Sequence, residues 1–153
     1  MAFRFRLAKV LEWYDRLYQI EAERLRQSAA RAQQAHQNLI RHRELRLESE
    51  QEMLQMDSLQ GEDMAARERY RRRSLLQEAH LGQLGQDADK EVEAQRTVAL
   101  AARRKVLLVE KLRDRKREEF NYLAARELEE IAADSWLAGY ARSLVENESI
   151  QDG

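Results

Sequence analysis

Mainly apolar residues recur along the first third of the chain at alternating steps of four and three, with polar residues at several of the steps. The stepped positions are Leu7, Leu11, Tyr14, Tyr18, Glu21, Leu25, Ser28, Ala32, Ala35, Leu39, His42, Arg46, Ser49, Met53 and Met56. A period of 3.5 residues keeps one stripe of a helix facing a partner helix. The register holds for seven heptads. This pattern predicts one long coiled-coil helix.

The composition contains little that could break a helix or form a sheet. The 153 residues include no proline, no cysteine and only five glycines, and 36% are charged. The absence of cysteine excludes a disulfide scaffold and fits a reducing compartment. The longest apolar run, from Val98 to Ala102, is far too short to span a bilayer. We expect an all-α, cytoplasmic protein that does not insert into a membrane.

The stretch from Asp57 to Asp63 carries the signals of a chain reversal. Gly61 suits the left-handed position after a helix end. Asp63 is a candidate N-cap, and Glu62 complements the dipole of a following helix. We therefore predict a single antiparallel two-helix hairpin over residues 1–147, with a helix over 4–56, a turn at 57–63 and a longer helix over 63–146. The acidic end, 148–153, is expected to be disordered.

A rival turn is possible at 82–89, where Gly82 and Gly85 precede candidate caps. The first turn gives helices of roughly 80 Å and 125 Å and places residue 115 approximately opposite Phe5. It leaves Phe120 to Leu144 beyond the paired region, as an apolar segment in need of a partner. The rival turn would nearly equalise the helices.

Charge is segregated along the second helix. Residues 103–117 carry a net charge of +6, and residues 118–134 carry −5. Such blocks are a solvated face with local ion pairs, or a docking surface for a protein of complementary charge. Nucleic-acid binding is least favoured, because the acidic block would repel phosphates and the whole chain has a net charge of −1.

No pattern in the sequence indicates catalysis, a cofactor or a metal. His36, His42 and His80 lack the spacing of a zinc site on one helix, so we expect surface or seam positions for them. There is no glycine-rich phosphate loop or nucleophile elbow. A two-helix hairpin offers no cleft in which to shift carboxylate pKa values. We expect a non-enzyme.

Two stretches resemble the flagellar FliJ protein family. The first is Met1 to Leu11, with a Phe-basic-Phe start followed by Leu and Val-Leu. The second runs from Glu110 to Ala132, where Glu-Lys-Leu leads into a basic run, Phe120 and an acidic Leu…Ile-Ala segment. Between residues 30 and 105 the likeness is one of helical character alone.

The resemblance implies a stalk-like coupling protein of the bacterial flagellar type III export apparatus, which serves flagellum biogenesis and motility. Its expected partners are the hexameric flagellar export ATPase, the export gate, which is a membrane protein, and export chaperones. It would be cytoplasmic and peripheral at the cytoplasmic face of the inner membrane. The expected contacts with the ATPase ring, at the terminal end, are Phe3, Phe5, Arg115, Arg117 and Phe120. The expected contacts with the gate, near the hairpin tip, are Tyr70, Leu76 and His80.

Other functions remain open at this stage. One is a structural coiled coil that dimerises through the wide apolar face at Val10, Leu17 and Ile20. Another is the equivalent stalk protein of an injection-type type III secretion system.

Overall fold

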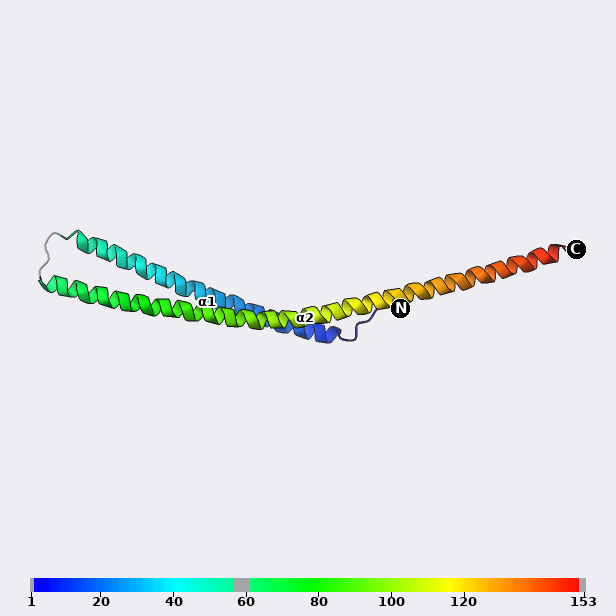
Figure 1. Cartoon of the computed structure of the whole chain (residues 1–153), viewed down its shortest axis with the longest axis horizontal. Helices are drawn as coiled ribbons and strands as arrows, with labels where there is room; N and C mark the ends of the chain where they lie inside the picture. The colour runs from blue at the N-terminus through cyan, green and yellow to red at the C-terminus, as the bar shows by residue number, and fades with distance from the viewer. Residues whose placement is uncertain (1, 57–60, 152–153) are drawn as a thin grey trace. The chain divides into compact units, whose positions relative to one another are not determined.

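The computed structural model describes residues 2–56 and 61–151, and these form two helices and no strand. Helix α1 spans Ala8–Leu54 (47 residues) and helix α2 spans Gly61–Gln151 (91 residues) (Figure 1). The predicted all-α class, with a longer second helix, is confirmed. By their internal contacts the residues group into two units, Trp13–Val106 and Met1–Glu12 with Leu107–Gly153.

The unit Trp13–Val106 is an antiparallel pair of helices that lie side by side (Figure 1). Every stepped position predicted for the first helix, from Tyr14 to Met53, is buried or half-buried. Helix α2 has buried or half-buried residues at the same spacing. They are Ser74, Glu78, Leu81, Gly85, Ala88, Val92, Gln95, Ala99, Ala102 and Val106. The coiled-coil seam predicted from the 3.5-residue period is therefore confirmed in this unit.

The most buried seam positions of this unit carry small side chains. Ser28 and Ser74 are 2% and 5% exposed, and Ala32 and Ala99 are similarly buried. Such side chains contribute little apolar area, but they let two helices approach closely. At Gly85 an added Cβ would lie 3.2 Å from the ring of His36 on the facing helix. Gly85 therefore lies at a close approach of the two helices rather than at a turn.

Helix α1 ends with a tightened last turn. The N–H groups of Gln55 and Met56 donate to carbonyls three residues earlier, at Glu52 and Met53. The guanidinium of Arg67, on α2, also donates to the Met53 carbonyl. These bonds satisfy carbonyls that a helix end leaves without partners.

The predicted roles of Gly61 and Asp63 are wrong. Helix α2 already begins at Gly61, and no described glycine has a positive φ, so Gly61 is not a left-handed cap. Asp63 lies within the first turn of α2 and is not its N-cap. The expectation for Glu62 is met, because Glu62 lies in that first turn, where its charge complements the helix dipole. The remainder of the predicted turn, 57–60, lies outside the described residues.

The rival turn at 82–89 is excluded, because α2 passes through it without a break. At its other end α2 continues to Gln151, beyond the end expected at residue 146 and into the segment expected to be disordered. Residues 152 and 153 lie outside the described chain.

In the unit that contains both chain ends, residues 2–5 have no regular structure and α1 begins at Ala8, so the helix start expected at residue 4 is corrected. The alternating burial of residues 3–6 explains why this segment is not helical. Phe3 and Phe5 are half-buried, whereas Arg4 and Arg6 are exposed. An extended segment places alternate residues on one side, whereas a helix would separate Phe3 and Phe5 by about 200°.

Within the described residues, no helix combines the length and the apolar character needed to cross a membrane.

Candidate partner-binding sites

The segment before α1 and the second half of α2 line an open pocket of about 610 Å³. Six apolar side chains contribute to its lining: Phe3, Phe5, Leu7, Leu112, Phe120 and Leu123. All belong to the unit that contains both chain ends. We call this the terminal pocket.

The aromatic contact at Phe3 joins the two sides of the terminal pocket. Its ring centroid lies 5.7 Å from that of Phe120, with the planes tilted by 54°. The guanidinium carbon of Arg117 lies 5.7 Å from the Phe3 centroid, over the ring. Tilted aromatic pairs and cation–π contacts of this kind each contribute about 0.5–1 kcal/mol. The geometry fixes Phe3 on α2 without covering the pocket.

Charges at the rim of the terminal pocket are mostly basic. Arg4, Arg6 and Lys116 contribute to the lining, together with the single carboxylate of Glu119. Glu119 is partly neutralised because Lys116 Nζ lies 2.8 Å from its Oε2. An apolar floor with a basic rim suits an apolar segment that carries carboxylates.

Four of the five residues predicted for the ATPase contact lie together. Phe3, Phe5 and Phe120 line the terminal pocket, and Arg117 lies over Phe3. Arg115 is exposed and does not contribute to the lining. Leu112, Lys116 and Leu123 also line the terminal pocket and were not predicted, although they recur with Phe120 at helical spacing and so share its face.

The residues predicted for the gate contact do not form one site. Tyr70 lines a pocket of about 470 Å³ near the chain reversal, with Met53, Leu54, Met64 and Leu75 as its apolar neighbours. Leu76 and His80 are exposed and do not line that pocket. They are four residues apart and share a face of α2.

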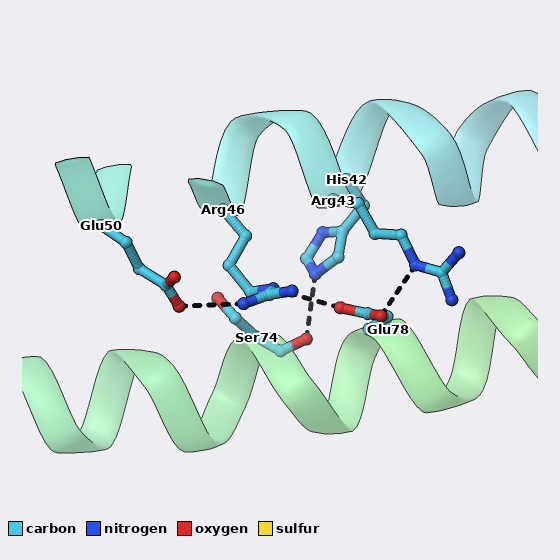
Figure 2. A network of polar contacts seen from close by, with 6 residues as sticks. All are labelled: His42, Arg43, Arg46, Glu50, Ser74 and Glu78. Atoms are coloured by element: carbon cyan, nitrogen blue, oxygen red, sulfur yellow. Dashed lines mark hydrogen bonds and ion pairs between the residues drawn. The ribbon is translucent and has the colours of Figure 1, made fainter. Parts of the chain in front are cut away.

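A polar cluster crosses the seam between these helices (Figure 2). Glu78 of α2 accepts from Arg43 Nε at 2.8 Å and from Arg46 Nε at 3.1 Å. Arg46 also donates to Glu50 at 2.9 Å. One turn away, His42 Nε2 donates to the Ser74 carbonyl oxygen at 2.9 Å. The polar seam positions His42 and Arg46 therefore both find hydrogen-bond partners on α2.

The cluster shifts two pKa values in the direction that favours the charged forms. Hydrogen bonding and the positive charge of Arg43, together with Arg46, hold the pKa of the Glu78 carboxyl below its ordinary value of 4.5. The hydrogen bond to Glu50 is the main cause of the raised pKa of Arg46. Glu78 therefore remains ionised down to lower pH in the hairpin than in the unfolded chain.

The other two histidines lie at the surface of the helices. His36 Nε2 lies 2.9 Å from Asp89 Oδ1 across the pair of helices, and His80 is exposed. The prediction of surface or seam positions is confirmed for all three histidines. Among the described residues, no group of three or more metal-ligating side chains is placed to hold a metal ion.

Comparison with known proteins found no protein-family model, no curated protein and no solved structure that matches this chain. The resemblance to the FliJ family stays a prediction.

Proposed function

We propose that this chain is a non-enzymatic coupling protein of the bacterial flagellar type III export apparatus. The observation that carries the proposal is the terminal pocket. It is assembled from the two stretches, Met1 to Leu11 and Glu110 to Ala132, in which the sequence resembles the FliJ family. The two stretches that resemble the same family are distant in sequence, and both contribute side chains to this one pocket.

The chemistry of the terminal pocket supports a protein partner. Aromatic and arginine side chains are the usual anchors of protein interfaces, and Phe3, Phe5 and Arg117 supply them here. The apolar floor is open and its rim is mainly basic. In this proposal the pocket receives an apolar, acidic surface of the hexameric export ATPase, and the chain couples that ring to the export gate.

The contact with the gate is assigned to the reversal end of α1 and α2. Tyr70 lines the pocket there, which has both apolar and charged walls, while Leu76 is 69% exposed on a neighbouring face with His80. We place the protein in the cytoplasm, held peripherally at the inner membrane through the gate and exchanging export chaperones there. An equivalent role in an injection-type apparatus would use the same surfaces.

The test is capture of the ATPase from a lysate of flagellated bacteria, followed by binding and stimulation assays with the purified ATPase. Wild-type protein is expected to capture the hexamer and raise its turnover. The double variant Phe3→Ala, Phe5→Ala is expected to weaken binding by about tenfold or more, as loss of interface anchors does. Capture of an injection-type ATPase instead would reassign the apparatus.

The matched control is Ile40→Ala with Leu47→Ala. Both residues are about half exposed on α1 and lie outside the terminal pocket. The control removes comparable apolar surface and is expected to leave ATPase binding unchanged. If wild-type protein and the Phe3, Phe5 variant bind and stimulate the ATPase equally, the stalk role of the terminal pocket is wrong.

A further inference from the structure

The part of α2 after the terminal pocket is exposed, and the proposed function does not use it. Every described residue from 125 to 150 is exposed. The exposed side chains include Leu128 and Ile131, which are 67% and 56% exposed. Isolated helices with such apolar stripes are covered by a partner in stable assemblies.

Along one face of α2, the side chains are first basic, then apolar, and then acidic in chain order. We call this face the stripe. Steps of three and four residues connect Arg113, Lys116, Arg117, Phe120, Ala124 and Leu128, and then Ile131 and Asp134. Glu127 and Glu130 flank the last part of the stripe. The stripe therefore has a basic half and an acidic half, with apolar residues between them.

The acidic half is only partly neutralised within the chain. Arg126 pairs with Glu130 at 3.1 Å, and Lys116 pairs with Glu119 at 2.8 Å. Glu127, Glu129 and Asp134 take part in no ion pair among the described residues. Several carboxylates beside an apolar stripe thus remain available to an external basic surface.

We propose that a second copy of this chain covers the stripe in antiparallel orientation. A two-fold axis near Leu123 and Ala124 places Arg113 opposite Asp134 of the other copy. It places Arg117 opposite Glu130, which is only partly neutralised because its ion pair with Arg126 is exposed to solvent. The apolar residues Leu128 and Ile131 of each copy then enter the terminal pocket of the other, between basic groups at its rim. A self-complementary patch of this kind is what a two-fold interface requires.

The size of the patch predicts a reversible dimer. Residues 113–134 extend over about 32 Å of helix, and one helix face of this length buries an area at the lower end of specific interfaces. A dissociation constant in the micromolar range is expected. Because the dimer uses the terminal pocket, it excludes the contact proposed for the export ATPase.

The test uses sedimentation equilibrium on the purified full chain, with two charge-reversed variants. One carries Arg113→Glu and Arg117→Glu, and the other carries Glu130→Arg and Asp134→Arg. Each variant alone opposes like charges at both ends of the interface, so its dissociation constant is expected to rise by about tenfold or more. An equimolar mixture restores opposite charges in both halves and is expected to associate as wild type does.

The side chains exchanged are at exposed or half-exposed helix positions, and circular dichroism at 222 nm verifies that both variants remain helical. Wild-type protein that stays monomeric throughout the concentration range would overturn the proposal and leave the stripe to a different protein. Association that survives both variants but is lost on Leu17→Glu with Ile20→Glu would overturn it in favour of a four-helix bundle. A mixture that fails to associate would contradict the antiparallel register.

Discussion

Gly82 and Gly85 in the interior of α2 give a sharp test of the hairpin, because their surroundings differ while both are helical. At Gly82 an added Cβ meets nothing within 4 Å, whereas at Gly85 it lies 3.2 Å and 3.3 Å from ring atoms of His36. Alanine inside a helix is more favourable than glycine by about 0.8–1.0 kcal/mol. Gly82→Ala should therefore raise the free energy of unfolding by about 1 kcal/mol, or Tm by about 2–4 °C for a chain of this size.

At Gly85 the same gain is opposed by the cost of displacing the His36 ring. A contact of 3.2 Å requires the ring to move by a few tenths of an ångström, which disturbs its bond to Asp89. That pair is about half exposed, so its loss costs about 0–1 kcal/mol. Gly85→Ala is thus expected to stabilise by about 0–0.8 kcal/mol, less than Gly82→Ala.

The assay is urea unfolding followed by circular dichroism, for both variants in wild-type and His36→Ala backgrounds. In the His36→Ala background the two glycine substitutions should stabilise equally, since the opposing ring is gone. Equal effects already in the wild-type background would refute the close approach of Gly85 to His36. Destabilisation by Gly82→Ala would mean that α2 is interrupted near that residue.

Three further outcomes follow from contacts described above. The pKa of Glu78 is below its ordinary value of 4.5 in the hairpin, so the unfolded chain takes up that proton first as the pH falls. Acidification below pH 4.5 should therefore reduce the free energy of unfolding of the hairpin. Glu78→Gln should lower the urea midpoint at neutral pH and bring the midpoint closer to the wild-type value as the pH falls to about 3. Ala32→Leu should destabilise by about 1–3 kcal/mol through overpacking, whereas Ala30→Leu, at an exposed position, should change the unfolding free energy little. Phe3→Ala should speed amide exchange in residues 2–7 without changing helicity, since that segment is not helical; unchanged exchange would mean that the Phe3 contact does not hold it.

The fold could be predicted from the hydrophobic period, because that period persists over many heptads. The 3.5-residue period from Tyr14 to Met53 places the seam correctly, because only that face meets another helix. The end of the pairing was predicted too early: Phe120 was expected beyond the paired region, but its ring contacts Phe3. The reason is that residues 2–5 are not helical, and an extended segment reaches further along α2 than a helix of the same length.

Local cap assignments were less successful, for physical reasons. Gly61 was read as the end of α1, but the side chain of Arg67 and bonds of three-residue span satisfy the last carbonyls instead. The start of α1 was predicted at residue 4, whereas the helix begins at Ala8. The strict alternation of Phe3-Arg4-Phe5-Arg6 is a period of two, and that signal against a helix was already available in the sequence.

The partners of the polar seam residues could not be derived in advance. Seam position Arg46 needed a carboxylate on the other helix, and several lie at suitable distances along the chain. Only the axial alignment of the two helices selects Glu78. That alignment depends on the close approach at small residues such as Ser74, which a hydrophobic pattern does not encode.

The small side chains of the seam also determine how the hairpin responds to force. If its helices are peeled apart from the open end, contacts at residues such as Ser28, Ala32 and Ala99 are lost one heptad at a time, and each offers little resistance. If the helices are slid along their axes, the His36 ring must move past Gly85 while the bonds of Arg43 and Arg46 to Glu78 break together. The hairpin is therefore compliant to peeling and stiff to sliding.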